Sequence, residues 1–160
     1  MKKFLAVLIS ALTMITMSIT VFATQINQDS NLQTGDTTIT YTVAPSYTVT
    51  IPATVSLGET ATISAEGVIL NKGEQVIVRL TGTSDESNAF KITTAQGAEL
   101  TYTVKNGENA VAVGDTVLVV NADAATDSST TLSFSTPENV QFAGTYSGTV
   151  TFEVSVEAAN

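Results

Sequence analysis

The chain has 160 residues, enough for one globular domain, with a formal net charge of −9 and a pI near 4.1. It contains no Cys, no His and no Trp, which excludes disulfides, Cys or His zinc sites, and Ser-His-Asp or Cys-His catalysis. Because an acidic surface repels phosphate backbones and anionic lipid headgroups, we expect neither nucleic acid nor an anionic membrane surface as a partner.

The N-terminal segment, 1–23, has the pattern of a secretory signal peptide. Two lysines at positions 2 and 3 precede an uncharged stretch, 4–22, and Val21 and Ala23 place small residues at positions −3 and −1 of a cleavage site. Since the uncharged stretch is longer than the apolar part of a usual signal peptide, a retained membrane anchor is the alternative. Removing this segment takes away two lysines and no acid, so the rest of the chain is more acidic, with a net charge of −11. We expect a secreted, extracellular protein with no membrane span after the leader is removed.

The residues that follow the leader form a polar arm and then an alternating segment. Residues 24–36 are mostly polar and predict a flexible arm. In residues 37–43, Thr alternates with Ile39, Tyr41 and Val43. Two interpretations of this segment stay open. It is the first strand of its own domain, or it is a donor strand that adds to the open sheet edge of a neighbouring copy, as in pilin-like fibres.

The rest of the chain predicts a single all-β domain, residues 37–160. Thr, Val and Ile together make up about a third of the chain after the leader, and these β-branched residues favour strands. Eight to ten short strands separated by Gly, Asn, Asp and Pro predict an antiparallel, immunoglobulin-like β-sandwich. Asn106-Gly107 predicts a turn. Beyond residue 43, alternation or an apolar run predicts strands at 47–51, 60–64, 75–81, 89–93, 100–105, 116–120, 130–135 and 145–156.

The inward faces of these strands define the expected core. Tyr146 precedes a long alternating run, so we expect it to act as a tyrosine corner, with its ring in the core and its hydroxyl bonded to nearby backbone. Phe142 is the aromatic residue after the leader that stands outside a predicted strand. The core residues we expect are Phe90, Tyr102, Phe134, Tyr146, Val150, Phe152 and Val154.

Clustered acids are the main candidates for chemistry. Asp85 lies next to Glu86, and Asp123 lies near Asp127. Calcium needs six or more converging oxygens, and neither pair has an EF-hand pattern. We therefore interpret these residues as solvated loop acids and expect no metal site, no cofactor and no catalytic residue. A carbohydrate-acting enzyme is the weakest alternative, and it would require two or three carboxylates in one cleft.

Two short patterns suggest a family. Tyr146 is followed after three residues by Val150-Thr151-Phe152 and then by Val154, and an earlier element reads Phe90-Lys91-Ile92. These patterns resemble the closing motif and the first W-x-L element of WxL-type cell-surface domains of Gram-positive bacteria, with Phe in place of Trp in both. The layout of residues 37–58 is similar to the start of those domains.

This resemblance implies a secreted, non-catalytic structural or adhesion protein at the cell surface. Its partners would be other surface proteins, or wall polysaccharide or peptidoglycan bound noncovalently, and the WxL-like residues would be Phe90, Ile92, Phe152 and Val154. The alternative function is that of a pilin-like subunit that polymerises with itself by donating the strand that contains Ile39, Tyr41 and Val43.

Overall fold

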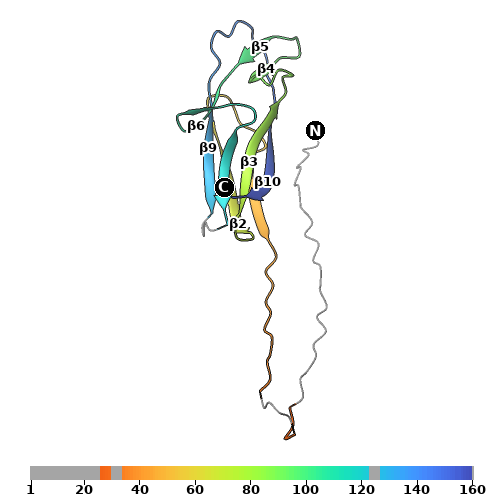
Figure 1. Ribbon diagram of the computed structural model, residues 1–160. Coiled ribbons are helices and arrows are strands. Elements are labelled where there is room, and N and C mark those ends of the chain that lie inside the picture. The colour runs from red at the N-terminus through yellow and green to blue at the C-terminus, as the bar shows by residue number, and fades with distance from the viewer. Residues whose placement is uncertain (1–25, 30–33, 123–126, 160) are drawn as a thin grey trace. The chain divides into compact units, whose positions relative to one another are not determined.

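The computed structural model describes residues 26–29, 34–122 and 127–159 and is all-β, as predicted (Figure 1). The expected leader, residues 1–23, and Asp123 lie outside the described residues. Among those described, no helix is both long and apolar enough to cross a membrane. The described strands are β1 (Ser46–Thr50), β2 (Thr60–Ile69), β3 (Glu74–Thr83), β4 (Lys91–Thr93), β5 (Glu99–Thr101), β6 (Val104–Asn106), β7 (Asn109–Val111), β8 (Thr116–Asn121), β9 (Ser128–Phe134) and β10 (Val150–Ala158).

The strands pair antiparallel in two larger sheets and one hairpin. One sheet has the order β1-β2-β9-β6-β7, the second has the order β10-β3-β8, and β4 pairs with β5. Side chains from the two larger sheets meet in one apolar core, which is the arrangement of a sandwich. The most deeply buried of them are aliphatic, namely Ile63, Val76, Val78, Leu80, Val104, Val120 and Leu132.

Both larger sheets end in strands with a free edge. β1 is an outer strand of the five-stranded sheet, and β10 is an outer strand of the three-stranded sheet. β4 and β5 lie at one end of the sandwich, at the top of Figure 1, whereas β1, in orange, begins at the opposite end. The chain therefore runs along β1 toward the end that carries the β4–β5 hairpin.

Residues 37–43 form no strand, which corrects the interpretation that they are the first strand of their own domain. The compact unit begins at Thr42 and its first strand at Ser46. To pair with the free edge of β1, residues 37–43 would have to turn back through Ala44-Pro45. In a two-residue turn, Ala44 would be the first central residue and Pro45 the second. The favoured turns need a positive φ at the first position, which suits Gly, Asn or Asp and not Ala, and type I′ also needs a positive φ at the second, where the ring of Pro fixes a negative value.

Two predicted strands differ from those observed because the chain changes partner. The strand expected at 100–105 is split into β5 and β6 at Tyr102, where the amide of Tyr102 donates to the carbonyl of Phe90 and the chain passes from β4 to β9. The strand expected from residue 145 begins at Val150. β7 was not predicted, but it forms the hairpin with β6 at the expected Asn106-Gly107 turn, where Gly107 has a φ of 59°.

Candidate functional site

An apolar cavity of about 790 Å³ lies at the β4–β5 end of the sandwich. Its walls come from the segment after β1, the segment between β9 and β10, and inner residues of both larger sheets. None of the lining residues carries a charged side chain, and most of them are apolar or Gly. They are Ile51, Pro52, Ala53, Thr54, Val55, Ser56, Leu57, Ala61, Ile63, Ile92, Leu100, Tyr102, Phe134, Pro137, Val140, Phe142, Ala143, Gly144, Tyr146, Ser147, Gly148, Thr149, Val150 and Phe152.

Two stretches of the rim lack backbone partners, although the Phe142 carbonyl accepts a hydrogen bond from the Tyr146 hydroxyl. Among the described residues, no backbone-to-backbone hydrogen bond joins residues 52–55 or 137–145 to another segment. These stretches also expose apolar side chains, since Val140 and Phe142 are 58% and 63% exposed. These stretches are irregular and not strands, but their amides and carbonyls without backbone partners lie beside exposed apolar side chains, so they can bond to the main chain of an added segment.

The next part of the rim is hydrogen-bonded to the β4–β5 hairpin and to the residue that follows β3. Ser147 and Thr93 exchange two backbone hydrogen bonds, of 2.9 and 3.1 Å, and the amide of Ser84 donates to the carbonyl of Thr149 over 2.9 Å. Gly148 makes this approach possible, because a Cβ there would lie 2.7 Å from the carbonyl oxygen of Lys91. One wall of the cavity is therefore fixed in place by close backbone packing.

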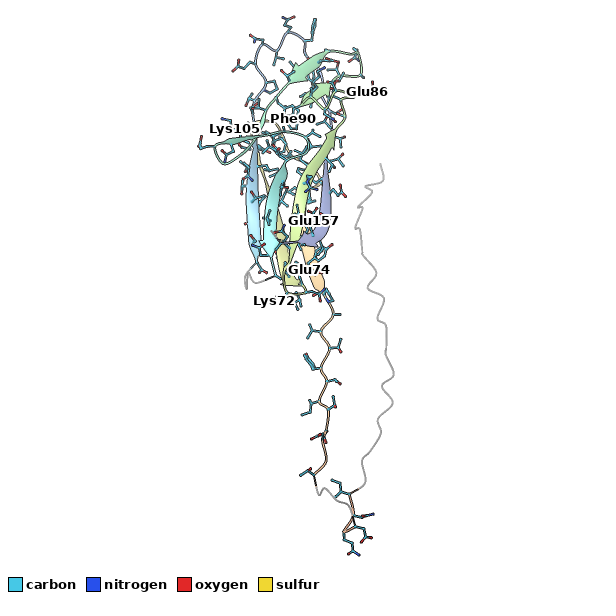
Figure 2. The ribbon with its side chains drawn as sticks, viewed as in Figure 1. Lys72, Glu74, Glu86, Phe90, Lys105 and Glu157 are labelled. Atoms are coloured by element: carbon cyan, nitrogen blue, oxygen red, sulfur yellow. The ribbon has the colours of Figure 1, made fainter. Side chains whose placement is uncertain are left out.

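The rings of Tyr102 and Phe134 line the floor of the cavity, and the ring of Phe90 packs behind them. Tyr102 is the middle ring of three, with its centroid 5.5 Å from that of Phe90 and 6.2 Å from that of Phe134. Burial raises the pKa of the Tyr102 phenol, whose hydroxyl makes no hydrogen bond to any described residue. Figure 2 shows Phe90 between the long strands and the hairpin end of the domain. The floor is thus apolar and suited to aliphatic or aromatic side chains.

The expected core residues lie in and around this cavity. Tyr102 and Phe134 are buried, and the other five (Phe90, Tyr146, Val150, Phe152 and Val154) are half-buried. Of the four WxL-like residues, Ile92 and Phe152 line the cavity, Phe90 packs against its floor, and Val154 pairs with Val78 in the sheet. The two motif-like elements, which are far apart in the sequence, therefore meet around one cavity.

The acids of the 85–91 region are used in local structure. Asp85 Oδ2 accepts from the amides of Ser87 and Ala89 and from the Ser87 hydroxyl. Lys91 Nζ lies 3.2 Å from Asp85 and 3.6 Å from Glu99. The Ser87 hydroxyl bond, aided by the Ala89 amide and Lys91, lowers the pKa of Asp85 from 3.8 to about 2. In the described part of the chain, no three acidic residues are grouped to hold a metal ion.

Sequence reasoning missed the exposed part of the rim. Val55, Val140 and Phe142 stand outside any alternating run, so no strand pattern marked them as parts of one surface. The available signal was the position of Phe142, a large apolar residue in a segment predicted as a loop.

Comparison of the chain with protein-family models, with curated proteins and with solved structures found no match.

Proposed function

We propose that this protein is a secreted, non-catalytic structural protein of the cell surface, and that it acts by binding an extended polypeptide segment in its apolar cavity. The single observation that carries the proposal is the combination of an uncharged lining with a rim, 52–55 and 137–145, whose described backbone makes no backbone-to-backbone hydrogen bond to another segment. A β-strand supplies alternating side chains to such a cavity and main-chain hydrogen bonds to such a rim.

The chemistry of the lining also favours a binding role over catalysis. General acid–base catalysis uses groups that gain and lose protons near neutral pH, and the lining carries no Asp, Glu, Lys or Arg. Its two phenols are Tyr102 and Tyr146, and burial raises the pKa of the first. Solubility outside the cell comes from the acidic surface, since net charge keeps such a domain dispersed.

The second candidate is WxL-like association with the cell wall at the same cavity. It is favoured by the meeting of Ile92 and Phe152, one from each motif-like element, on the cavity lining. A wall polysaccharide presents many hydroxyls, which need hydrogen-bonding partners when they are buried. The mainly apolar lining therefore suits a protein segment of the cell surface better than a sugar polymer.

The test of the proposed function uses the chain produced with its own leader and purified after export. The chain carries Ile39→Asp, so that its own alternating segment does not compete for the cavity. The probes are an eight-residue synthetic peptide of alternating Thr and Val and a version with Pro at every second position, which removes half of the donors. We expect saturable binding of the first peptide and at least tenfold weaker binding of the second by fluorescence anisotropy.

The matched variants are Phe142→Asp in the lining and Gln141→Asp beside it, outside the lining. We expect Phe142→Asp to abolish peptide binding and Gln141→Asp to preserve it. Isolated cell walls are tested in parallel by sedimentation. Binding to walls without binding to either peptide would favour the wall-polymer candidate, and binding to neither probe would refute the proposed function.

A further inference from the structure

The segment ahead of β1 exposes a row of apolar side chains. In residues 37–43, which have no assigned secondary structure, Ile39 and Tyr41 are 91% and 90% exposed, and Val43 is 54% exposed. Alternate residues of an extended chain point to the same side, so these three present one apolar face about 13 Å long at the usual rise of about 3.3 Å per residue. An unpaired alternating segment of this kind is a template for pairing with another sheet.

We propose that residues 37–43 of one copy of this chain occupy the apolar cavity of a second copy, adding a strand beside the segment that follows β1. This inference rests on the proposed function, because it names the segment that the cavity binds. Ile39, Tyr41 and Val43 enter the cavity, and the backbone of residues 37–43 pairs with the rim. The donated segment and the cavity are different surfaces of the same chain, so the contact is head-to-tail and extends into a filament unless the rotation between copies closes a ring.

The charges of the two surfaces agree with this pairing. The chain has a net charge of −9, but residues 37–43 carry no charge and neither does the cavity lining. Association therefore buries no ionised group and needs no compensating ion pair. Because the remaining surfaces of the two copies repel each other, added salt should screen that repulsion and strengthen assembly. An interface held by ion pairs would weaken instead.

The sequence between the segment and β1 disfavours the same contact within one chain. Ala44 and Pro45 are the two residues between Val43 and the start of β1 at Ser46. A hairpin along the free edge of β1 would place Val43 opposite Ser46 and Ile39 opposite Thr50, the last residue of β1. The lining begins at Ile51, so the apolar face would lie along β1 and short of the cavity. The Ala-Pro pair also lacks the turn chemistry that such a hairpin needs.

The experiment measures the assembly of the exported full chain by light scattering after size exclusion, and by negative-stain electron microscopy. We expect oligomers that grow with protein concentration and with salt. The double variant Ile39→Asp/Tyr41→Asp should be monomeric. Its matched control, Thr40→Asp/Thr42→Asp, adds the same charge to the same segment on the opposite face and should assemble more than the first variant.

A mixing experiment identifies the two surfaces. Phe142→Asp blocks the cavity but leaves residues 37–43 intact, whereas Ile39→Asp/Tyr41→Asp does the reverse. Each variant alone should be monomeric, and an equimolar mixture should give a 1:1 dimer that does not grow further. Val140→Asp is the second cavity variant, and circular dichroism checks that both cavity variants retain the native strand content.

The outcomes separate this inference from the proposed function. Wild-type chains that stay monomeric at all concentrations and salt levels, or oligomers that survive Ile39→Asp/Tyr41→Asp, would overturn strand donation between copies. If the Thr-Val peptide still binds the Ile39→Asp chain in that case, the cavity binds a segment of another protein and the proposed function stands. If the peptide also fails to bind, both are wrong.

Discussion

The hydroxyl of Tyr146 donates a hydrogen bond of 2.8 Å to the carbonyl oxygen of Phe142, four residues earlier in the chain. Both residues line the cavity, and this bond closes a loop in the part of the rim that has no backbone pairing. The expected bond from Tyr146 to nearby backbone is present, although the ring is half-buried and lies ahead of the strand. Tyr146 therefore holds the shape of the cavity rim.

Tyr146→Phe removes this bond and leaves the ring in place. Because a typical intramolecular hydrogen bond contributes about 0.5–1.5 kcal/mol, we expect a loss of that size in the free energy of unfolding. Tyr47→Phe is the control, since the Tyr47 hydroxyl makes no hydrogen bond to a described residue. Urea denaturation monitored by circular dichroism measures both variants, and equal stabilities would refute the role of Tyr146.

We expect the folded protein to lose stability in acid because of Asp85. Its pKa is about 2 in the folded protein against 3.8 ordinarily, so the folded state favours the ionised carboxylate. The stabilisation is present above pH 3.8 and is lost as the pH falls through 2. We expect the unfolding midpoint to fall over this range in the wild type and to fall less in Asp85→Asn. Glu86→Gln should keep the wild-type profile, and an Asp85→Asn profile that matches it would contradict the assignment.

Two phenylalanines of the cavity should differ sharply in their contribution to stability. Phe134 is 5% exposed and its ring packs at a tilt against that of Tyr102, so Phe134→Ala should cost about 3–5 kcal/mol. Phe142 is mostly exposed, and Phe142→Ala should change stability by less than about 0.5 kcal/mol. Thermal and urea unfolding compare the two. A large loss on Phe142→Ala would mean that this residue serves folding and not binding.

We expect a side chain at position 148 to clash with β4 at the hydrogen-bonded wall of the cavity. Gly148→Ala would set Cβ 2.7 Å from the backbone oxygen of Lys91, so the rim or β4 must move, at a cost of about 1–3 kcal/mol. Gly82→Ala is the matched control, because its Cβ would meet the nearest Thr151 atom at an ordinary 3.9 Å. Equal unfolding free energies for the two variants would show that the approach of residue 148 to β4 is loose.

The alternating segments were predictable because their pattern is local. In β2 and β9 the side chains alternate between an inner and an outer face, and this period of two is visible in the sequence, whereas β3 and β8 have consecutive buried residues and were predicted from apolar residues. The Asn106-Gly107 turn was predictable for a related reason, since its backbone needs a residue that tolerates positive φ. The absence of Cys, His and Trp limited the chemistry without any reference to the fold.

Contacts between distant residues were not predictable in this way. Alternation continues through residues 145–149 and 37–43, yet neither segment is a strand, because pairing depends on which edge lies within reach. Gly148 lies against β4, a segment far from it in the sequence, and β1 begins directly after Pro45.

The sequence by itself determined an acidic all-β chain, its turn positions and its poverty in reactive side chains, because these follow from composition and from the two-residue period. Only the tertiary structure decided that Ile92 and Phe152 share one cavity and that the described rim beside Val140 and Phe142 has no backbone-to-backbone partner. The physical reason is that a cavity forms where residues far apart in the chain do not fill the space between them, and a local sequence pattern carries no information about that space.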